Sequence, residues 1–148
     1  MEKENDAMEQ TSVLLQAAYK TAKMGSQAIS TILPKIENKE MKDILLSQLS
    51  RYDDLADRSS AELIKLGEKA KEHMLAEAMA DLMVQLKASM NPDPSKHAEM
   101  LINGATMGVI ELYRAKNASP SAAPISHTIA TDLNALVLDT VERMKSFL

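Results

Sequence analysis

The chain has 148 residues, of which 45% are hydrophobic and 26% charged, with a formal net charge of −4 and no cysteine. This length and balance favour a single folded domain over residues 1–148 and exclude an intrinsically disordered chain. The acidic charge and an aromatic content of 3% argue against nucleic acid as a partner, because phosphate binding needs a basic surface and base stacking needs aromatic rings.

The composition also bears on redox chemistry and location. Without cysteine the chain has no disulfide framework, no thiol chemistry and no cysteine-ligated metal. The first ten residues are acidic and polar and lack the apolar core of a secretion signal. No run approaches the roughly 18 apolar residues of a spanning helix, so we expect a cytoplasmic protein with no membrane span.

Apolar residues recur at spacings of three and four, and no convincing strand alternation interrupts them. The pattern predicts a first helix over residues 5–33, ended by Pro34. It predicts a second helix over residues 38–66, with Asn38 as N-cap and Gly67 as the stop. The two apolar stripes consist of Leu15, Tyr19, Ala22, Ser26, Ile29 and Leu33, and of Met41, Leu45, Leu49, Tyr52, Ala56, Ser59 and Leu63.

Three further helices complete the predicted all-α chain. The third covers residues 69–90, and the fourth runs from its expected N-cap, Ser95, to about residue 117. A turn-rich connector, ASPSAAP, then leads to a fifth helix. The stripe of the fifth helix consists of Ile125, Ile129, Leu133, Leu136, Thr140, Met144 and Phe147. Because the links are short, successive helices should run antiparallel, with alternating directions.

The first, second, fourth and fifth helices resemble the four helices of a ferritin-like bundle, in which a long crossover separates the second and third bundle helices. The segment MLINGATMGVIELYR (100–114) is similar to the opening of the third bundle helix in small bacterial ferritin-like proteins. There a methionine-rich turn with glycine leads into an acid-and-aromatic pair, here Glu111 and Tyr113. The resemblance implies a ferritin-like four-helix bundle with an additional crossover helix, the third of the five.

A ferritin-like fold also implies a di-iron or di-manganese centre, which uses a Glu-x-x-His pair on two helices. The residues argue against that centre. None of the three histidines has a glutamate three positions before it, and residues 11–36 contain no Asp or Glu. The second helix presents Gln48 and Arg51, or Ser50 and Asp53, where a ligand pair would fall. A reduced ligand set would consist of Asp53, Glu111 and Asp132.

The three tyrosines each fall near the middle of a bundle helix, and a buried hydroxyl needs a partner. One interpretation is a small polar pocket inside the bundle, formed by Tyr19, Gln48, Tyr52 and Tyr113. The other is that the tyrosine tips reach water. His97 and His127 lie near helix starts, where we expect them to be exposed. The Gly104 and Gly108 pair indicates close packing, inside the bundle or at a dimer interface.

The hypothesis favoured by these residues is a non-catalytic structural or protein-interaction module that needs no cofactor. Association through an apolar helix face, as a homodimer, is the expected mode. The expected interaction face on the third helix consists of Leu75, Met79, Leu82, Met83 and Leu86. Two alternatives stay open, a di-metal oxidase or storage protein with the reduced ligand set and a binder of a small apolar ligand between the helices.

Overall fold

The computed structural model describes residues 2–88 and 93–148, and these residues contain five α-helices and no strand. The prediction of an all-α chain with five helices is therefore confirmed. The helices are α1 (Glu2–Ile32), α2 (Lys39–Lys65), α3 (Glu72–Ala88), α4 (Pro94–Asn117) and α5 (Pro124–Met144), and short 3-10 turns, Leu33–Lys35 and Lys145–Phe147, follow α1 and α5.

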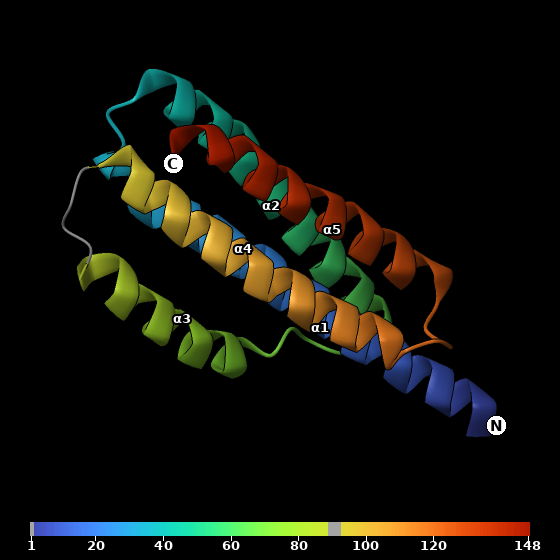
Figure 1. The fold of residues 1–148 in the computed structure, drawn as a ribbon. Helices are drawn as coiled ribbons and strands as arrows, with labels where there is room; N and C mark the ends of the chain where they lie inside the picture. The colour runs from blue at the N-terminus through green and yellow to red at the C-terminus, as the bar shows by residue number, and fades with distance from the viewer. Residues whose placement is uncertain (1, 89–92) are drawn as a thin grey trace.

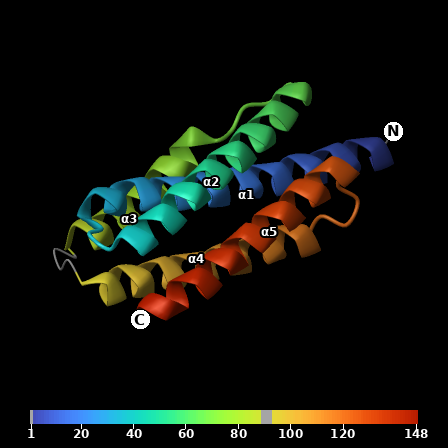
Figure 2. The ribbon, with the colours of Figure 1, turned by 90° about the horizontal axis from the view of Figure 1, so that it is seen from above.

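The helices α1, α2, α4 and α5 form a four-helix bundle, and α3 lies outside it. α1 packs on α2 and α4, α5 packs on the same two helices, and α1 also touches α5 across the bundle. Neighbouring bundle helices run antiparallel. α3 lies alongside α1 and runs in the same direction as α1, as Figures 1 and 2 show. The directions therefore alternate along the chain, and α3 joins the end of α2 to the start of α4 as a crossover helix.

Both predicted signals at the ends of α2 are confirmed. The Asn38 side chain accepts a hydrogen bond from the backbone N–H of Met41 at 3.0 Å and caps the helix. At the other end Gly67 has a φ of 77°, a conformation that glycine adopts without strain. The N–H of Gly67 then donates to the carbonyl of Ile64 and the N–H of Glu68 to that of Leu63, which is the Schellman pattern.

The start of α4 differs from the prediction. Asp93 caps the helix instead of Ser95, and its side chain accepts from the Ser95 backbone N–H at 3.0 Å. Pro94 occupies the first helical position, where its missing N–H leaves no donor unsatisfied and its fixed φ suits the helix. The helix therefore begins earlier than we expected, and His97 at the end of its first turn is buried.

The start of α3 lies at Glu72, later than the predicted residue 69, while the predicted end at residue 90 lies outside the described residues. Gln16 of α1 bonds to the backbone of the link before α3. Its amide donates to the carbonyl of Lys69 at 2.8 Å and accepts from the N–H of Lys71 at 3.0 Å. Because these backbone groups bond to Gln16, they do not enter a helix.

Most residues of the predicted stripes are buried, with Leu33, Leu49 and Phe147 half-buried and Ile125 exposed in the first turn of α5. The two glycines of α4 differ. A Cβ atom at Gly108 would lie 3.3 Å from Thr21 Cγ2 of α1, whereas one at Gly104 would have no neighbour within 4 Å. Close packing inside the bundle therefore accounts for Gly108 and not for Gly104.

Candidate functional site

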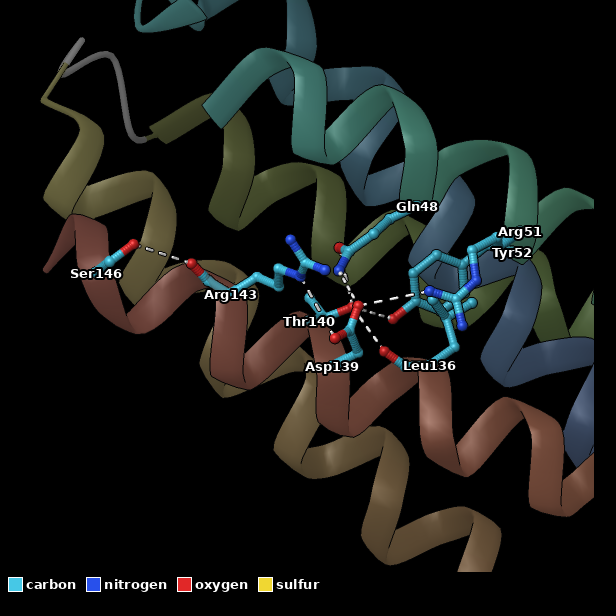
Figure 3. A network of polar contacts seen from close by, with 8 residues as sticks. All are labelled: Gln48, Arg51, Tyr52, Leu136, Asp139, Thr140, Arg143 and Ser146. Atoms are coloured by element: carbon cyan, nitrogen blue, oxygen red, sulfur yellow. Dashed lines mark hydrogen bonds and ion pairs between the residues drawn. The ribbon is translucent and has the colours of Figure 1, made fainter. Parts of the chain in front are cut away.

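A buried polar cluster joins the middle of α2 to α5 (Figure 3). Gln48 and Tyr52 lie four residues apart and therefore share a face of α2. Thr140 meets them from α5, and all three side chains are at most 3% exposed. The Tyr52 hydroxyl lies 2.8 Å from Thr140 Oγ1, which lies 3.1 Å from Gln48 Oε1. We call Gln48, Tyr52 and Thr140 the central cluster.

The hydrogen bonds of the central cluster have a definite direction. Thr140 Oγ1 lies 3.1 Å from two acceptors, Gln48 Oε1 and the carbonyl oxygen of Leu136. A hydroxyl carries one proton, so both hydroxyls are satisfied as donors when Thr140 donates to one of these acceptors and Tyr52 donates to Thr140. Burial raises the pKa of Tyr52 to about 12, which keeps the phenol protonated at neutral pH. Both hydroxyls of the cluster are thus satisfied by neighbouring side chains and backbone.

Asp139 connects the central cluster to the surface. The Gln48 amide donates to Asp139 Oδ2 at 3.3 Å, and Arg51 Nη1 lies 3.5 Å from the same oxygen. Arg143 Nε lies 3.5 Å from Asp139 Oδ1. These two guanidinium groups neutralise the carboxylate and would repel a metal cation placed beside it. The arrangement ties α2 to α5, and the partly exposed ion pairs add at most about 1 kcal/mol each.

The other two tyrosines lie away from this cluster. Tyr19 is 6% exposed, and its hydroxyl donates to Glu72 Oε1 at 2.6 Å, at the start of α3. Burial and this hydrogen bond raise the pKa of Tyr19 to about 12. Tyr113 is 43% exposed, and its oxygen accepts from Asn134 Nδ2 at 3.3 Å. Of the four residues predicted to line one polar pocket, the structure therefore brings together Gln48 and Tyr52.

Thr140 is the member of the central cluster that the sequence reasoning did not single out. It occupies a position on the predicted apolar stripe of α5, between Leu136 and Met144, where it is 2% exposed. A polar residue on a buried stripe needs a hydrogen-bond partner. That pattern was the available signal, but the partner, Tyr52, is 88 residues away in the chain.

The three carboxylates of the reduced metal set take different partners. Ser26 donates to Asp53 between α1 and α2. Glu111 of α4 lies 3.5 Å from Lys20 of α1, and Asp132 of α5 lies 3.2 Å from Arg58 of α2. Within residues 2–88 and 93–148 no group of three or more His, Asp or Glu side chains is arranged to hold a metal ion. The structure therefore does not bring these carboxylates together.

The apolar face predicted for interaction on α3 turns toward the protein itself. Leu75 and Leu86 are 8% and 2% exposed, and Met79, Leu82 and Met83 are half-buried. α3 packs on α1, and the Thr31 hydroxyl of α1 donates to Met83 Sδ at 3.5 Å. The face is thus occupied largely by α1.

His97 is buried, so the expectation that it is exposed was wrong. It is 1% exposed, and neither ring nitrogen has a hydrogen-bond partner among the described residues. Burial lowers its pKa, Lys35 lowers it further, and Asp93 opposes the shift. The second helix-start histidine, His127, is half-buried, with Nε2 3.1 Å from the Ser119 carbonyl oxygen.

Two surface grooves are present in the described part of the molecule. The larger, about 600 Å³, lies between the start of α1 and the link before α3, with Met8, Val13 and Leu66 on its walls. A shallower groove of about 450 Å³ lies along α2 beside Asp53 and Asp57. Both are open to solvent, and neither includes the central cluster.

Comparison of this chain with known protein families, with curated proteins and with solved structures gives no match. Among the described residues no helix is both long enough and apolar enough to cross a membrane.

Proposed function

We propose that this protein is a non-catalytic helical module that acts by binding another macromolecule. The observation that carries the proposal is that the polar groups of the central cluster are hydrogen-bonded to neighbouring protein groups. The Tyr52 hydroxyl bonds to Thr140, Thr140 lies within hydrogen-bond distance of Gln48, and the Gln48 amide donates to Asp139. All three side chains of the cluster are buried. A catalytic site keeps polar groups available to a substrate, whereas this cluster uses them to hold α2 and α5 together.

We further propose that the bundle has a ferritin-like core. The support is the helix order, in which α3 crosses from the end of α2 to the start of α4, together with the antiparallel packing of neighbouring bundle helices. A ferritin-like fold would have its ligand pair near Gln48 and Arg51, or near Ser50 and Asp53. A neutral amide and a guanidinium supply no negative charge to bind a dication, and the second pair supplies a single carboxylate.

The ion pairs between helices give the proposal a second support. Lys20 with Glu111 links α1 to α4, and Arg58 with Asp132 links α2 to α5. A carboxylate that faces an amine or guanidinium across a helix interface contributes to the packing of two helices. These acidic groups are therefore assigned a structural role, which agrees with a protein that works through its surface.

Metal loading tests this proposal against the di-metal alternative. The purified protein is incubated with iron(II) or manganese(II), freed of unbound metal, and its metal content is measured by mass spectrometry. We expect far less than one ion per chain, with no change in the triple variant Asp53→Asn, Glu111→Gln and Asp132→Asn. A stoichiometric load that the triple variant loses would overturn the proposal.

The larger groove supports a second candidate function, the binding of a small ligand with both apolar and polar groups, because charged residues such as Glu68 and Lys69 line it beside the apolar ones. Met8 and Val13 are 52% and 47% exposed on its walls, and its volume is within the range of small-molecule pockets. Native mass spectrometry of the purified protein tests this candidate directly. A retained small molecule that is lost in the variant Val13→Lys would favour it, and a bare chain mass in both proteins would exclude it.

A further inference from the structure

The outward surface of α4 carries a run of residues without charge. Residues 100–110 contain no Asp, Glu, Lys or Arg, in a chain of which 26% of residues are charged. Within this run Met107 is 67% exposed and Ile110 is 47% exposed, and their spacing of three places them side by side on the helix. Two large apolar side chains are therefore adjacent within a segment that carries no charge.

Single exposed apolar residues occur elsewhere on the described surface, such as Ile64 of α2 and Val84 of α3, which are 65% and 70% exposed. Such residues are ordinary at protein surfaces. On α4 charged residues also follow, at positions 111 and 114, but Met107 and Ile110 are two exposed apolar side chains one turn apart. Adjacent apolar side chains form a larger apolar area, which is a feature of interaction sites.

The position of this surface follows from the contacts on its two sides. Glu111 reaches Lys20 of α1 on one side, and Tyr113 reaches Asn134 of α5 on the other. Four exposed residues lie between these two flanks around the helix and point away from the bundle. We call them the α4 patch, which consists of Asn103, Thr106, Met107 and Ile110.

Two opposite charges stand at the ends of the α4 patch. Glu99 precedes it and Arg114 follows it, both exposed on the same side of the helix and about 22 Å apart along its axis. The ion pair between Glu99 and Lys96 is an exposed contact of 3.6 Å within one helical turn. Such a pair is weak, so it does not prevent Glu99 from binding another cation.

This charge arrangement is complementary to itself in one orientation. If two copies of α4 pair antiparallel about a two-fold axis between residues 106 and 107, Glu99 of each copy meets Arg114 of the other. The same register places Thr106 opposite Met107 and Asn103 opposite Ile110. Parallel pairing would instead place Glu99 beside Glu99 and Arg114 beside Arg114, which is repulsive. Closed two-fold pairing is also the commonest form of self-association.

We infer that two copies of this chain associate through the α4 patch, antiparallel and related by two-fold symmetry. The inference rests on the proposed function and names the partner, a second copy of the chain. One helix face is smaller than the interface of a typical stable complex, which buries about 800 Å² on each side. The dimer therefore exchanges with the monomer and depends on protein concentration.

Sedimentation equilibrium of the full chain over a range of concentrations tests this inference. We expect a monomer–dimer equilibrium that Met107→Lys weakens at least about tenfold, because it places two like charges beside the two-fold axis in a desolvated contact. Val84→Lys is the matched control, since it adds the same charge at an equally exposed position of α3, and should leave association unchanged. Circular dichroism melting shows whether each variant is folded.

Charge reversal provides the sharper test of the orientation. Glu99→Arg alone and Arg114→Glu alone should each weaken association roughly tenfold, because each converts two attractive contacts into repulsive ones. The double variant should return to within about twofold of the wild-type constant. Rescue of this kind does not follow from a change in folding stability.

The outcomes separate this inference from the proposed function. A chain that stays monomeric at every concentration overturns the inference. A dimer that is indifferent to Met107→Lys and to both reversals also overturns it, because the contact must then lie on another surface. Neither result restores a metal site, so the proposed function fails only if the metal-loading experiment finds stoichiometric metal.

Discussion

The ring of Tyr52 lies directly against the backbone of Gly25, where α1 and α2 pack together. A Cβ atom at position 25 would come within 2.7 Å of Tyr52 Cε1, so a larger residue there would displace the ring. Glycine inside a helix costs about 1 kcal/mol relative to alanine. Here the close approach of α2 offsets that cost, and it places the Tyr52 hydroxyl within reach of Thr140.

We predict that Gly25→Ala destabilises the fold by about 1 kcal/mol, because overpacking costs about 1 to 3 kcal/mol and the gain in helix propensity offsets only part of it. Urea unfolding followed by circular dichroism measures the change. Gly104→Ala is the matched control. A Cβ atom there has no neighbour within 4 Å, so we expect it to stabilise the monomer by up to about 1 kcal/mol. Equal effects at the two positions would contradict the close packing of Tyr52 on Gly25.

We predict that Thr140→Val destabilises the protein by about 2 kcal/mol. The substitution keeps the side-chain shape but removes the hydroxyl that accepts from Tyr52 and donates to Gln48 or Leu136. Leaving a buried donor without a partner costs about 1 to 3 kcal/mol. Tyr52→Phe should cost less, about 1 kcal/mol, since it removes a donor and leaves Thr140 its carbonyl acceptor. Urea unfolding of both variants gives the comparison.

Tyr113→Phe is the control for the central cluster, because Tyr113 loses the same hydroxyl at a 43% exposed position. We expect a change below about 0.5 kcal/mol there. If Tyr113→Phe and Tyr52→Phe had the same effect, the hydrogen bond between Tyr52 and Thr140 would contribute nothing beyond an exposed contact.

His97 should make the fold sensitive to mild acid. Burial lowers its pKa in the folded protein, whereas the unfolded chain binds the proton near the ordinary value of about 6.5. Stability is thus fully present above about pH 6.5 and is lost as the pH falls from there toward the folded pKa. The loss is up to about 1.4 kcal/mol per pH unit. Urea unfolding at several pH values measures this slope.

The variant His97→Leu should flatten the stability profile below about pH 6.5. His73→Gln, at an exposed position of α3, is the comparison and should keep the acid sensitivity of the wild type. A His97→Leu protein with an unchanged slope would show that another group binds the proton on unfolding.

Gln16 should control the order of the link before α3. Its amide group bonds to the backbone of Lys69 and Lys71, so Gln16→Ala leaves two backbone groups to water. We predict faster hydrogen exchange in residues 68–72 while exchange in α2 and α5 stays unchanged, because opening of a local segment requires less free energy than global unfolding. Gln27→Ala, an exposed position farther along α1, is the control and should change neither.

The local features of this fold could be predicted from the sequence because they depend on residues that are close in the chain. The count of five helices follows from the spacing of apolar residues. The N-cap at Asn38 and the stop at Gly67 depend on side-chain and backbone geometry within one helical turn. The cap of α4 was misplaced where two neighbouring residues, Asp93 and Ser95, both suit the position.

The sites depend on how each helix is rotated against its neighbours, which no single helix determines. Only the packed structure brings Tyr52 to Thr140, separates Asp53, Glu111 and Asp132, and turns the apolar face of α3 toward α1. Periodicity along a helix identifies its apolar side, but the partner of that side is set by all the helices packing at once. The sequence alone therefore determined the helices and their buried stripes, and the tertiary structure decided which polar groups meet and which surface remains open.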